Sequence, residues 1–373
     1  MLSSPPTYLP LNLKSLKMVG ISNSLMNLSA AQFQRLSLRK CTIDSLTVPP
    51  TLTSFKSVLN SFKQLNLNCV ATKAIFESSD MPPAVLIPTH CTQLKVRSLR
   101  ILFMQLTELR RLELIDCDHS QLATTVKLSK LTALTFIAKS AGEFIREEEI
   151  PKLMFSSCLV DLKLQNVCFV RIGGRKVAKV DIEFLNGNVG EDSKVLTDTK
   201  DMKETPKSGI KRTDITPEFL FGEEVHEFHL KGLQTVKEVS ADFLYVEGAN
   251  ELSIGKCFGL HLRNCRGKIG FENESQKKVG YVHLYNCVYD KTNFAVFKNI
   301  TKMRVDVFGK FKENMWKFSQ FTNLMNLTLF ASQINLSKLD LPTTVTAVDV
   351  AAPKIISNFN NKQLRQIKLL SVV

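Results

Sequence analysis

Three histidines in the C-terminal half of the sequence are the residues best suited to chemistry. His229, His261 and His283 each stand between two large apolar residues, an alternation that is typical of a half-buried β-strand. Neighbouring parallel strands lie about 4.8 Å apart, so adjacent imidazoles could share a metal ion or exchange a proton. No cysteine or carboxylate pair completes a ligand set. We therefore expect three exposed strand histidines, with a pH-sensitive contact as the alternative.

A second group of possible ligands is the run Asp116, Cys117, Asp118 and His119. Alternation along a strand sends consecutive side chains to opposite faces, so we expect no metal site there. The glycine-rich loops that bind phosphate, the serine motif of hydrolases and the paired histidines of zinc proteases are all absent from the sequence. The sequence therefore predicts a protein that is not an enzyme and that has neither a cofactor nor a metal.

Basic side chains are spread over the N-terminal half of a chain whose net charge is +14. On one face of a sheet they could contact phosphates or an acidic peptide, although the aromatic side chains that stack on bases are missing from this half. The leading expectation is a face that is kept soluble by its charge. The candidate partner-binding residues are Lys17, Arg35, Arg39, Lys95, Arg97, Arg110, Arg111, Lys163, His229, His261, His283 and Tyr285.

A repeat determines the elements that must position these side chains. The motif Leu-x-x-Leu-x-Leu-x-x-Cys-x-apolar recurs roughly every 20 residues and is clearest at residues 33–43 and 109–119. The Leu-x-Leu pair predicts a short strand, and stacked parallel strands predict a solenoid. Weaker copies occupy residues 13–18, 131–136, 159–169, 177–182, 225–230, 279–287, 300–305, 324–334, 345–355 and 364–369.

This pattern resembles the leucine-rich repeat superfamily over residues 9–185 and 220–373, although asparagine is absent at its ninth position. The resemblance implies an α/β solenoid with a curved parallel β-sheet on the concave face and an irregular or short-helical convex side. The irregular repeats are similar to those of F-box/leucine-rich-repeat proteins, although no F-box precedes the first repeat. That similarity implies a substrate-recognition subunit of a ubiquitin ligase.

We expect one continuous solenoid with an interruption. Residues 1–185 form its N-terminal half and residues 219–373 its C-terminal half. Residues 186–218 are rich in Asp, Lys, Thr and Gly, which predicts a polar, flexible insertion. Between Phe243 and Phe271 the apolar pairs lie too close together for full repeats, which indicates either a hairpin or a strand on the convex side.

The cysteines indicate the cellular compartment. The chain has nine, and five of them take one position of the repeat, as small buried side chains would. We therefore expect unbridged thiols in the cytoplasm or the nucleus. Neither a signal peptide nor an apolar run long enough for a membrane helix occurs. The five cysteines are Cys41, Cys117, Cys257, Cys265 and Cys287.

A solenoid without catalytic motifs functions through its surface. The leading hypothesis is a non-catalytic scaffold that presents its concave sheet to a protein partner. The alternative is a nucleic-acid- or chromatin-associated protein that uses the basic part of that sheet, in which case binding weakens as salt rises. No small-molecule substrate is expected.

Overall fold

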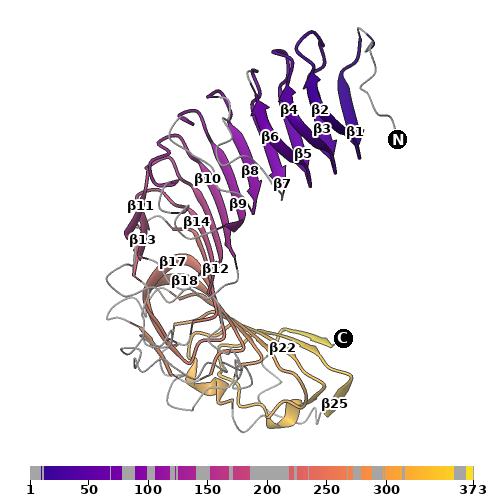
Figure 1. Cartoon of the computed structure of the whole chain (residues 1–373). Helices are drawn as coiled ribbons and strands as arrows, with labels where there is room; N and C mark the ends of the chain where they lie inside the picture. Colours follow the sequence, from indigo (N-terminus) through magenta and orange to yellow (C-terminus); the bar gives the residue numbers. More distant parts are fainter. Residues whose placement is uncertain are drawn as a thin grey trace, which may run out of the picture. The chain divides into compact units, whose positions relative to one another are not determined.

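The computed structural model describes residues 10, 12–67, 69–77, 89–98, 106–117, 122, 125–139, 152–167, 171–184, 218–221, 225–233, 235–266, 268–271, 279–287, 297, 299–312, 316–356 and 367–372. The chain divides into two compact units. Figure 1 draws the whole chain and labels many of its strands. Unit 1 comprises Met1–Val177 with Leu220–Gly222, and unit 2 comprises Ala178–Phe219 with Glu223–Val373. The predicted insertion lies outside the described residues apart from Glu218, so its flexible character stays a prediction.

In unit 1 the predicted short strands form a parallel sheet, called here the main sheet of the unit. In β3, Leu36 and Leu38 are buried while Arg35 and Arg39 point to solvent, on the side called here the open face. Successive strands pair in register, so equivalent residues form columns across the open face. The strands are β1 (Ser15–Val19), β3 (Arg35–Arg39), β5 (Ser54–Val58), β7 (Lys73–Glu77), β8 (Gln93–Arg97), β9 (Arg111–Cys117), β10 (Ala133–Ala138) and β12 (Asp161–Val167).

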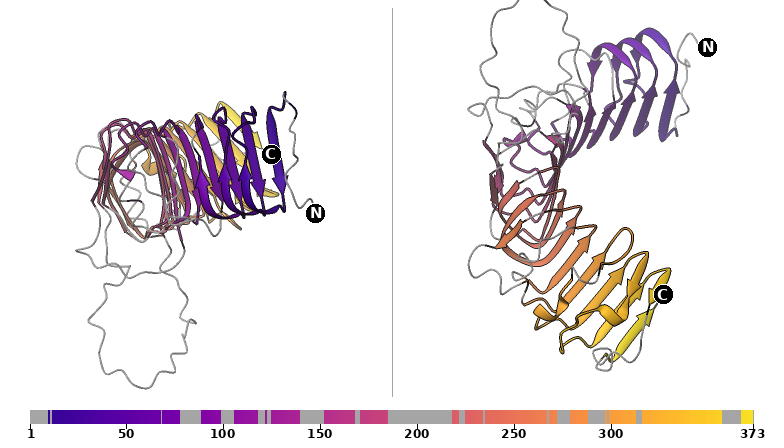
Figure 2. Two further views of the ribbon diagram at one scale, coloured as in Figure 1. Left: turned by 45° about the horizontal axis from the view of Figure 1, so that its top comes forward. Right: turned by 90° about the horizontal axis from the view of Figure 1, so that it is seen from below.

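The second side of the coils is also β-structure, so the predicted α/β class with an irregular or short-helical convex side is wrong. The protein is a parallel β-solenoid of stacked coils, and Figure 2 shows both strand layers in the N-terminal coils. The strands on the second side of unit 1 are β2 (Ser22–Asn27), β4 (Thr42–Thr47), β6 (Ser61–Asn66), β11 (Lys152–Phe155), β13 (Arg171–Gly174) and β15 (Phe219–Phe221).

The length of a coil explains why this side is not helical. Ser15 pairs with Arg35, and Arg35 pairs with Ser54, so these coils are 20 and 19 residues long. A helix rises 1.5 Å per residue and a strand about 3.3 Å. A helix that spans the length of a five-residue strand would therefore need about 11 residues. Too few residues of the coil would then remain for its two corners.

Unit 2 has the same architecture. In its main sheet β16 buries Phe228 and Leu230 and leaves His229 on the open face. Among the described elements of unit 2, the only helices with defined bounds are two 3-10 turns on the second side. The main sheet contains β14 (Lys179–Phe184), β16 (Glu227–Lys231), β17 (Thr235–Glu247), β18 (Glu251–Arg263), β20 (Tyr281–Tyr285), β21 (Lys302–Asp306), β22 (Asn326–Phe330), β24 (Ala347–Ala351) and β26 (Leu369–Val372). The second side contains β19 (Lys268–Phe271), β23 (Gln333–Asn335), β25 (Lys354–Ile356), η6 (Phe318–Gln320) and η7 (Leu336–Lys338).

Two 13-residue strands explain the crowded apolar pairs between Phe243 and Phe271. The first part of β18 pairs with β19 on the second side of the coil, and its last five residues pair with β20 in the main sheet. Because these pairings are parallel, the strand on the convex side is the correct alternative and the hairpin is wrong. Phe243 pairs with Gly259, so this coil is only 16 residues long. It can be this short because one continuous strand connects the two layers without a loop.

In several coils the position after the corner holds a residue that joins neighbouring coils. At Asn60 the side-chain Nδ2 donates to the carbonyl oxygen of Leu38 at 3.0 Å, and Oδ1 accepts from the backbone N–H of Cys41 at 2.7 Å. The preceding corner residue, Leu59, has a left-handed φ of 54°. The expectation that asparagine is absent at this position is therefore wrong, because residues 52–62 form a further repeat.

The buried cysteines occupy two different positions in the coil. Sγ of Cys265 follows a corner and lies 3.4 Å from the carbonyl oxygen of Val246 in the preceding coil. Cys257 instead precedes its main-sheet segment, where Sγ lies 2.9 Å from the carbonyl oxygen of Gly259. Cys91 has the equivalent place in unit 1. The prediction that Cys257 shares the position of the other four cysteines is therefore wrong, and none of the described cysteines is in a disulfide.

Candidate binding surface

The open face of unit 2 carries the predicted histidines in an order that differs from the expectation. The strand register pairs His229 with Tyr245, Tyr245 with His261, and His261 with His283. Tyr245 separates the first two histidines because β17 adds a coil in which Ala241 stands in place of the first leucine of the motif. The middle column of the open face contains Asp181, His229, Tyr245, His261, His283 and Arg304, in that order.

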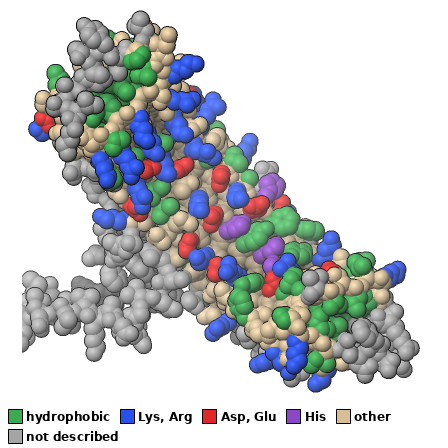
Figure 3. All heavy atoms as spheres, turned by 90° about the vertical axis from the view of Figure 1, so that its right-hand side faces the viewer, with side chains coloured by type: hydrophobic (Ala, Val, Ile, Leu, Met, Phe, Trp, Pro, Cys, Tyr) green, Lys and Arg blue, Asp and Glu red, His purple; other side chains and the backbone are tan. Residues whose placement is uncertain are grey.

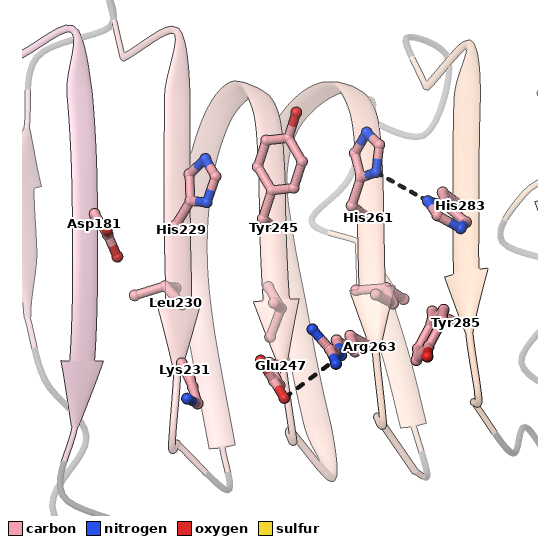
Figure 4. A pocket seen from close by; sticks show the side chains of 12 residues that line it. Asp181, His229, Leu230, Lys231, Tyr245, Glu247, His261, Arg263, His283 and Tyr285 are labelled. Carbon is pink, nitrogen blue, oxygen red and sulfur yellow. Dashed lines mark hydrogen bonds and ion pairs between the residues drawn. The ribbon is translucent and has the colours of Figure 1, made fainter.

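Three rings of this column stack on one another (Figure 4). The ring centroids of His229 and Tyr245 are 4.1 Å apart, and those of Tyr245 and His261 are 4.3 Å apart, with interplanar angles of 19° in both pairs. His283 meets His261 edge-on at 5.4 Å. Stacked and edge-on rings are the favoured arrangements of aromatic pairs. The contacts therefore hold the imidazoles in defined orientations on the sheet.

A chain of polar contacts leads from His261 to Arg304. The Nδ1 atoms of His261 and His283 are 3.3 Å apart, and Nε2 of His283 is 3.1 Å from Oδ2 of Asp306. Arg304 donates to both carboxylate oxygens of Asp306 at 3.0–3.1 Å. Asp306 is only 9% exposed, so the arginine compensates a nearly buried charge.

Burial lowers the pKa of two of the histidines. Desolvation is the largest cause that lowers the pKa of His261, to about 4, and the positive charge that His283 can carry acts in the same direction. Desolvation also lowers the pKa of His229, against the opposing effect of Asp181 and Glu227. The side chains of His229 and His283 are 38% and 21% exposed, so these strand histidines are half-buried rather than exposed.

Charged side chains of alternating sign form a second column beside the rings. Lys231 Nζ is 2.9 Å from Oε1 of Glu183, whose carboxylate raises the pKa of the lysine. Arg263 Nε lies 3.7 Å from Oε1 of Glu247. The rings and the paired charges together line an open groove of about 470 Å³. Lys231 and Arg263 on its wall therefore each have a carboxylate partner.

Near the end of this column, aromatic side chains stand on either side of Asp306. Tyr285, Phe308 and Phe330, called here the aromatic patch, line a second hollow of about 300 Å³. Tyr285 meets Phe308 edge-on at 5.2 Å. The guanidinium of Arg263 lies 5.0 Å from the ring centroid of Tyr285, and that of Arg304 lies 4.4 Å from the centroid of Phe330. Arginine and aromatic groups therefore meet at a single place on the surface.

The predicted basic residues lie on the open face of unit 1, where lysine and arginine side chains gather over the N-terminal coils in Figure 3. Lys56 and Lys73 share this face but were not predicted as candidates, because their coils lack the leucines of the motif. Arg110 is exposed immediately before β9. The first column contains Arg35, Lys73 and Arg111, the middle column Lys17, Lys56, Lys95 and Lys163, and the third column Arg39 and Arg97.

Acidic neighbours neutralise part of this basic face. Lys95 Nζ is 3.5 Å from Glu113 and 3.9 Å from Glu77, and Arg97 Nε is 2.9 Å from Asp116. The basic side chains for which no carboxylate among the described residues forms an ion pair are Lys17, Arg35, Arg39, Lys56, Lys73 and Arg111.

The sequence predicted these residues as candidates, but the structure brings them together in two separate groups. His229, His261, His283 and Tyr285 share the groove of unit 2, whereas the basic candidates all belong to unit 1. Several members of the unit 2 surface were missed as candidates, among them Tyr245, Asp306 and Phe308. The alternation Leu-Tyr-Val in β17 is a signal that could have found the first of them.

Comparison with known proteins does not assign the chain to a family. No model of a protein family matches it, and no curated protein matches its sequence. In the part of the chain that the structure describes, we find no helix with the length and hydropathy needed to cross a membrane. The same residues contain no group of three or more His, Cys, Asp or Glu side chains placed to hold one metal ion.

Proposed function

We propose that the protein is a non-catalytic scaffold that binds a protein partner on the open face of unit 2. The observation that carries this proposal is the aromatic patch, in which Phe308 is 69% exposed beside a hollow of the surface. Aromatic side chains and arginine are enriched at the centres of protein interfaces, where they contribute most of the binding energy. An incoming apolar side chain that fills the hollow would remove this phenylalanine from water.

The surroundings of the patch support the same proposal. The ion pairs between Lys231 and Glu183 and between Arg263 and Glu247 form a polar border that is already compensated. A partner that covers this border does not leave an unpaired buried charge, which would oppose binding. The stacked rings of the middle column add a rigid wall, so little side-chain entropy is lost on association.

Purification of the tagged protein from its own cells tests the proposal. Mass spectrometry identifies the proteins that are retained at high salt, and we expect the double variant Tyr285→Ala/Phe308→Ala to lose them. Phe258→Ala is the matched control, because Phe258 is 56% exposed but does not line the hollow. A partner that binds the double variant as well as the unchanged protein would exclude the aromatic patch as its site.

A narrower form of the proposal is a substrate-recognition subunit of a ubiquitin ligase. It is supported only by the similarity of the repeats to those of F-box/leucine-rich-repeat proteins and by the solenoid architecture. A ligase adaptor among the retained proteins would favour this form. We also propose that the protein resides in the cytoplasm or the nucleus, since the buried Sγ of Cys265 contacts backbone carbonyls as a thiol donor would.

The second candidate function is binding to nucleic acid or chromatin through the basic face of unit 1. The observation that favours it is the set of lysines and arginines with no acidic partner among the described residues, above all Lys17, Arg35 and Arg39. Contacts of this kind are electrostatic, so the binding they produce falls steeply with salt.

A further inference from the structure

The contact between His261 and His283 has the nitrogen–nitrogen distance of two ligands of one metal ion. Their Nδ1 atoms are 3.3 Å apart. In a tetrahedral zinc site with Zn–N bonds of about 2.0–2.1 Å, two ligand nitrogens are separated by about 3.3 Å. The two rings meet at an interplanar angle of 76°, so they are not stacked face to face. Figure 4 shows both imidazoles on the wall of the groove.

Asp306 determines which nitrogen of His283 is available to a metal. The carboxylate accepts a hydrogen bond from Nε2 at 3.1 Å, so the lone pair of the neutral ring lies on Nδ1. A carboxylate behind a metal-binding histidine orients the ring and raises its basicity. Arg304 holds Asp306 in place through hydrogen bonds to both of its oxygens.

His261 is held in position by its neighbours. Its ring stacks on Tyr245 at 4.3 Å and meets Tyr281 edge-on at 5.1 Å. A neutral imidazole carries a hydrogen on one ring nitrogen and a lone pair on the other. In the absence of metal, Nδ1–H of His261 donates to Nδ1 of His283. A metal ion bound by both Nδ1 atoms would require this proton to reside on Nε2 of His261 instead.

We propose that His261 and His283 bind one divalent transition-metal ion of the zinc type through their Nδ1 atoms. Two nitrogens fill half of a tetrahedron, and both residues line the open groove. The remaining positions are therefore left to water or to a side chain from outside, as in an open rather than a structural site. The proposal is independent of the proposed function, because it concerns binding of the metal alone.

Calorimetric titration of zinc chloride into the full-length, chelator-treated protein tests this site. We expect saturable binding of one ion per chain. His261→Gln and His283→Gln should each abolish this binding, and Asp306→Asn should weaken it by about 10–100-fold. His226→Gln is the matched control, because His226 is an exposed histidine of unit 2 that is paired with Asp242 outside the groove. Absence of saturable binding, or an equal loss in the control, would overturn the proposal.

A second measurement covers the case in which a variant does not fold. Circular dichroism and thermal melting establish whether each variant keeps the fold of the unchanged protein. If the glutamine variants unfold at a lower temperature than the unchanged protein, electron paramagnetic resonance tests the site instead. The unchanged protein is measured with one equivalent of Cu²⁺, since imidazole nitrogen is a good ligand for this ion. Hyperfine coupling to two imidazole nitrogens supports the site, and a spectrum without nitrogen coupling overturns it.

Discussion

The buried thiols of Cys91 and Cys257 act as small hydrogen-bonding side chains rather than as reactive groups. Burial raises the pKa of Cys257 to about 12 and that of Cys91 to about 11, because the thiolate would lose its hydration. Both Sγ atoms also lie within hydrogen-bonding distance of a backbone carbonyl oxygen two residues further on, an acceptor that only a protonated thiol can use. Cys158, by contrast, is exposed. Cysteine reactivity should therefore differ sharply between these positions.

Alkylation measures this difference. We expect iodoacetamide at about pH 8 to modify Cys158 rapidly, and Cys91 and Cys257 only after denaturant is added, since the thiolate is the reacting species. Mass spectrometry of peptides from a time course gives the rate for each cysteine. The same reaction in denaturant is the control, in which the rates should become similar. Equal rates in the folded protein would contradict the raised pKa values.

At the scale of elements, the main-sheet strands could be predicted from the sequence because their pattern is local. The Leu-x-Leu alternation identifies both the strand and its buried face. The coils at residues 52–62 and 71–77 escape this pattern, since the buried Ser57 and Ala74 stand where other coils have large apolar residues. Each missed coil also removes one neighbour from every column. The coil that contains Tyr245 was missed in the same way, because Ala241 stands in place of its first leucine. Tyr245 was therefore absent from the predicted histidine column.

The strands of the second side could not be predicted in the same way. β4 buries Ile43 and Leu46, and β6 buries Phe62 and Leu65. A spacing of three residues fits the period of a helix better than that of a strand, and polar residues fill the gaps. Parallel pairing with the neighbouring coils stabilises the extended form there. This stabilisation comes from non-local contacts that a local pattern does not contain.

Asn60 provides a test of how neighbouring coils are joined. Asn60→Ala removes hydrogen bonds to Leu38 and Cys41 inside the core, so we expect the free energy of unfolding to fall by about 2–3 kcal/mol. Asn60→Cys should destabilise less, because cysteine occupies this position in other coils. Chemical denaturation followed by circular dichroism gives the values.

Asn23→Ala is the control for this substitution. Its side-chain oxygen accepts a hydrogen bond from the backbone N–H of Leu25 at an exposed position. We expect a change within about 0.5 kcal/mol, as for most surface substitutions. If the control destabilises the protein as much as Asn60→Ala does, the inter-coil hydrogen bonds have no special role.

At the scale of the whole molecule, the two units present open faces of different chemistry. The face of unit 2 combines stacked rings, compensated charges and the aromatic patch. The face of unit 1 retains basic side chains that have no acidic partner among the described residues. The two proposed kinds of partner therefore depend on different residues, so substitutions in one unit can test one function without removing the other.

Charge reversal on the basic face tests the nucleic-acid function. Lys95 and Arg97 are left unchanged because they are paired with acids. If single-stranded nucleic acid binds here, the slope of log K against log salt concentration should become about 3 units less steep on loss of four contacts, at about 0.7 per phosphate. Fluorescence anisotropy at several salt concentrations measures this slope.

The control for this charge reversal replaces four lysines of unit 2 with glutamate and so changes the net charge equally. An unchanged slope in the test variant would exclude this face as the binding site. The test variant is Lys17→Glu/Arg35→Glu/Arg39→Glu/Lys56→Glu, and the control is Lys310→Glu/Lys317→Glu/Lys338→Glu/Lys354→Glu.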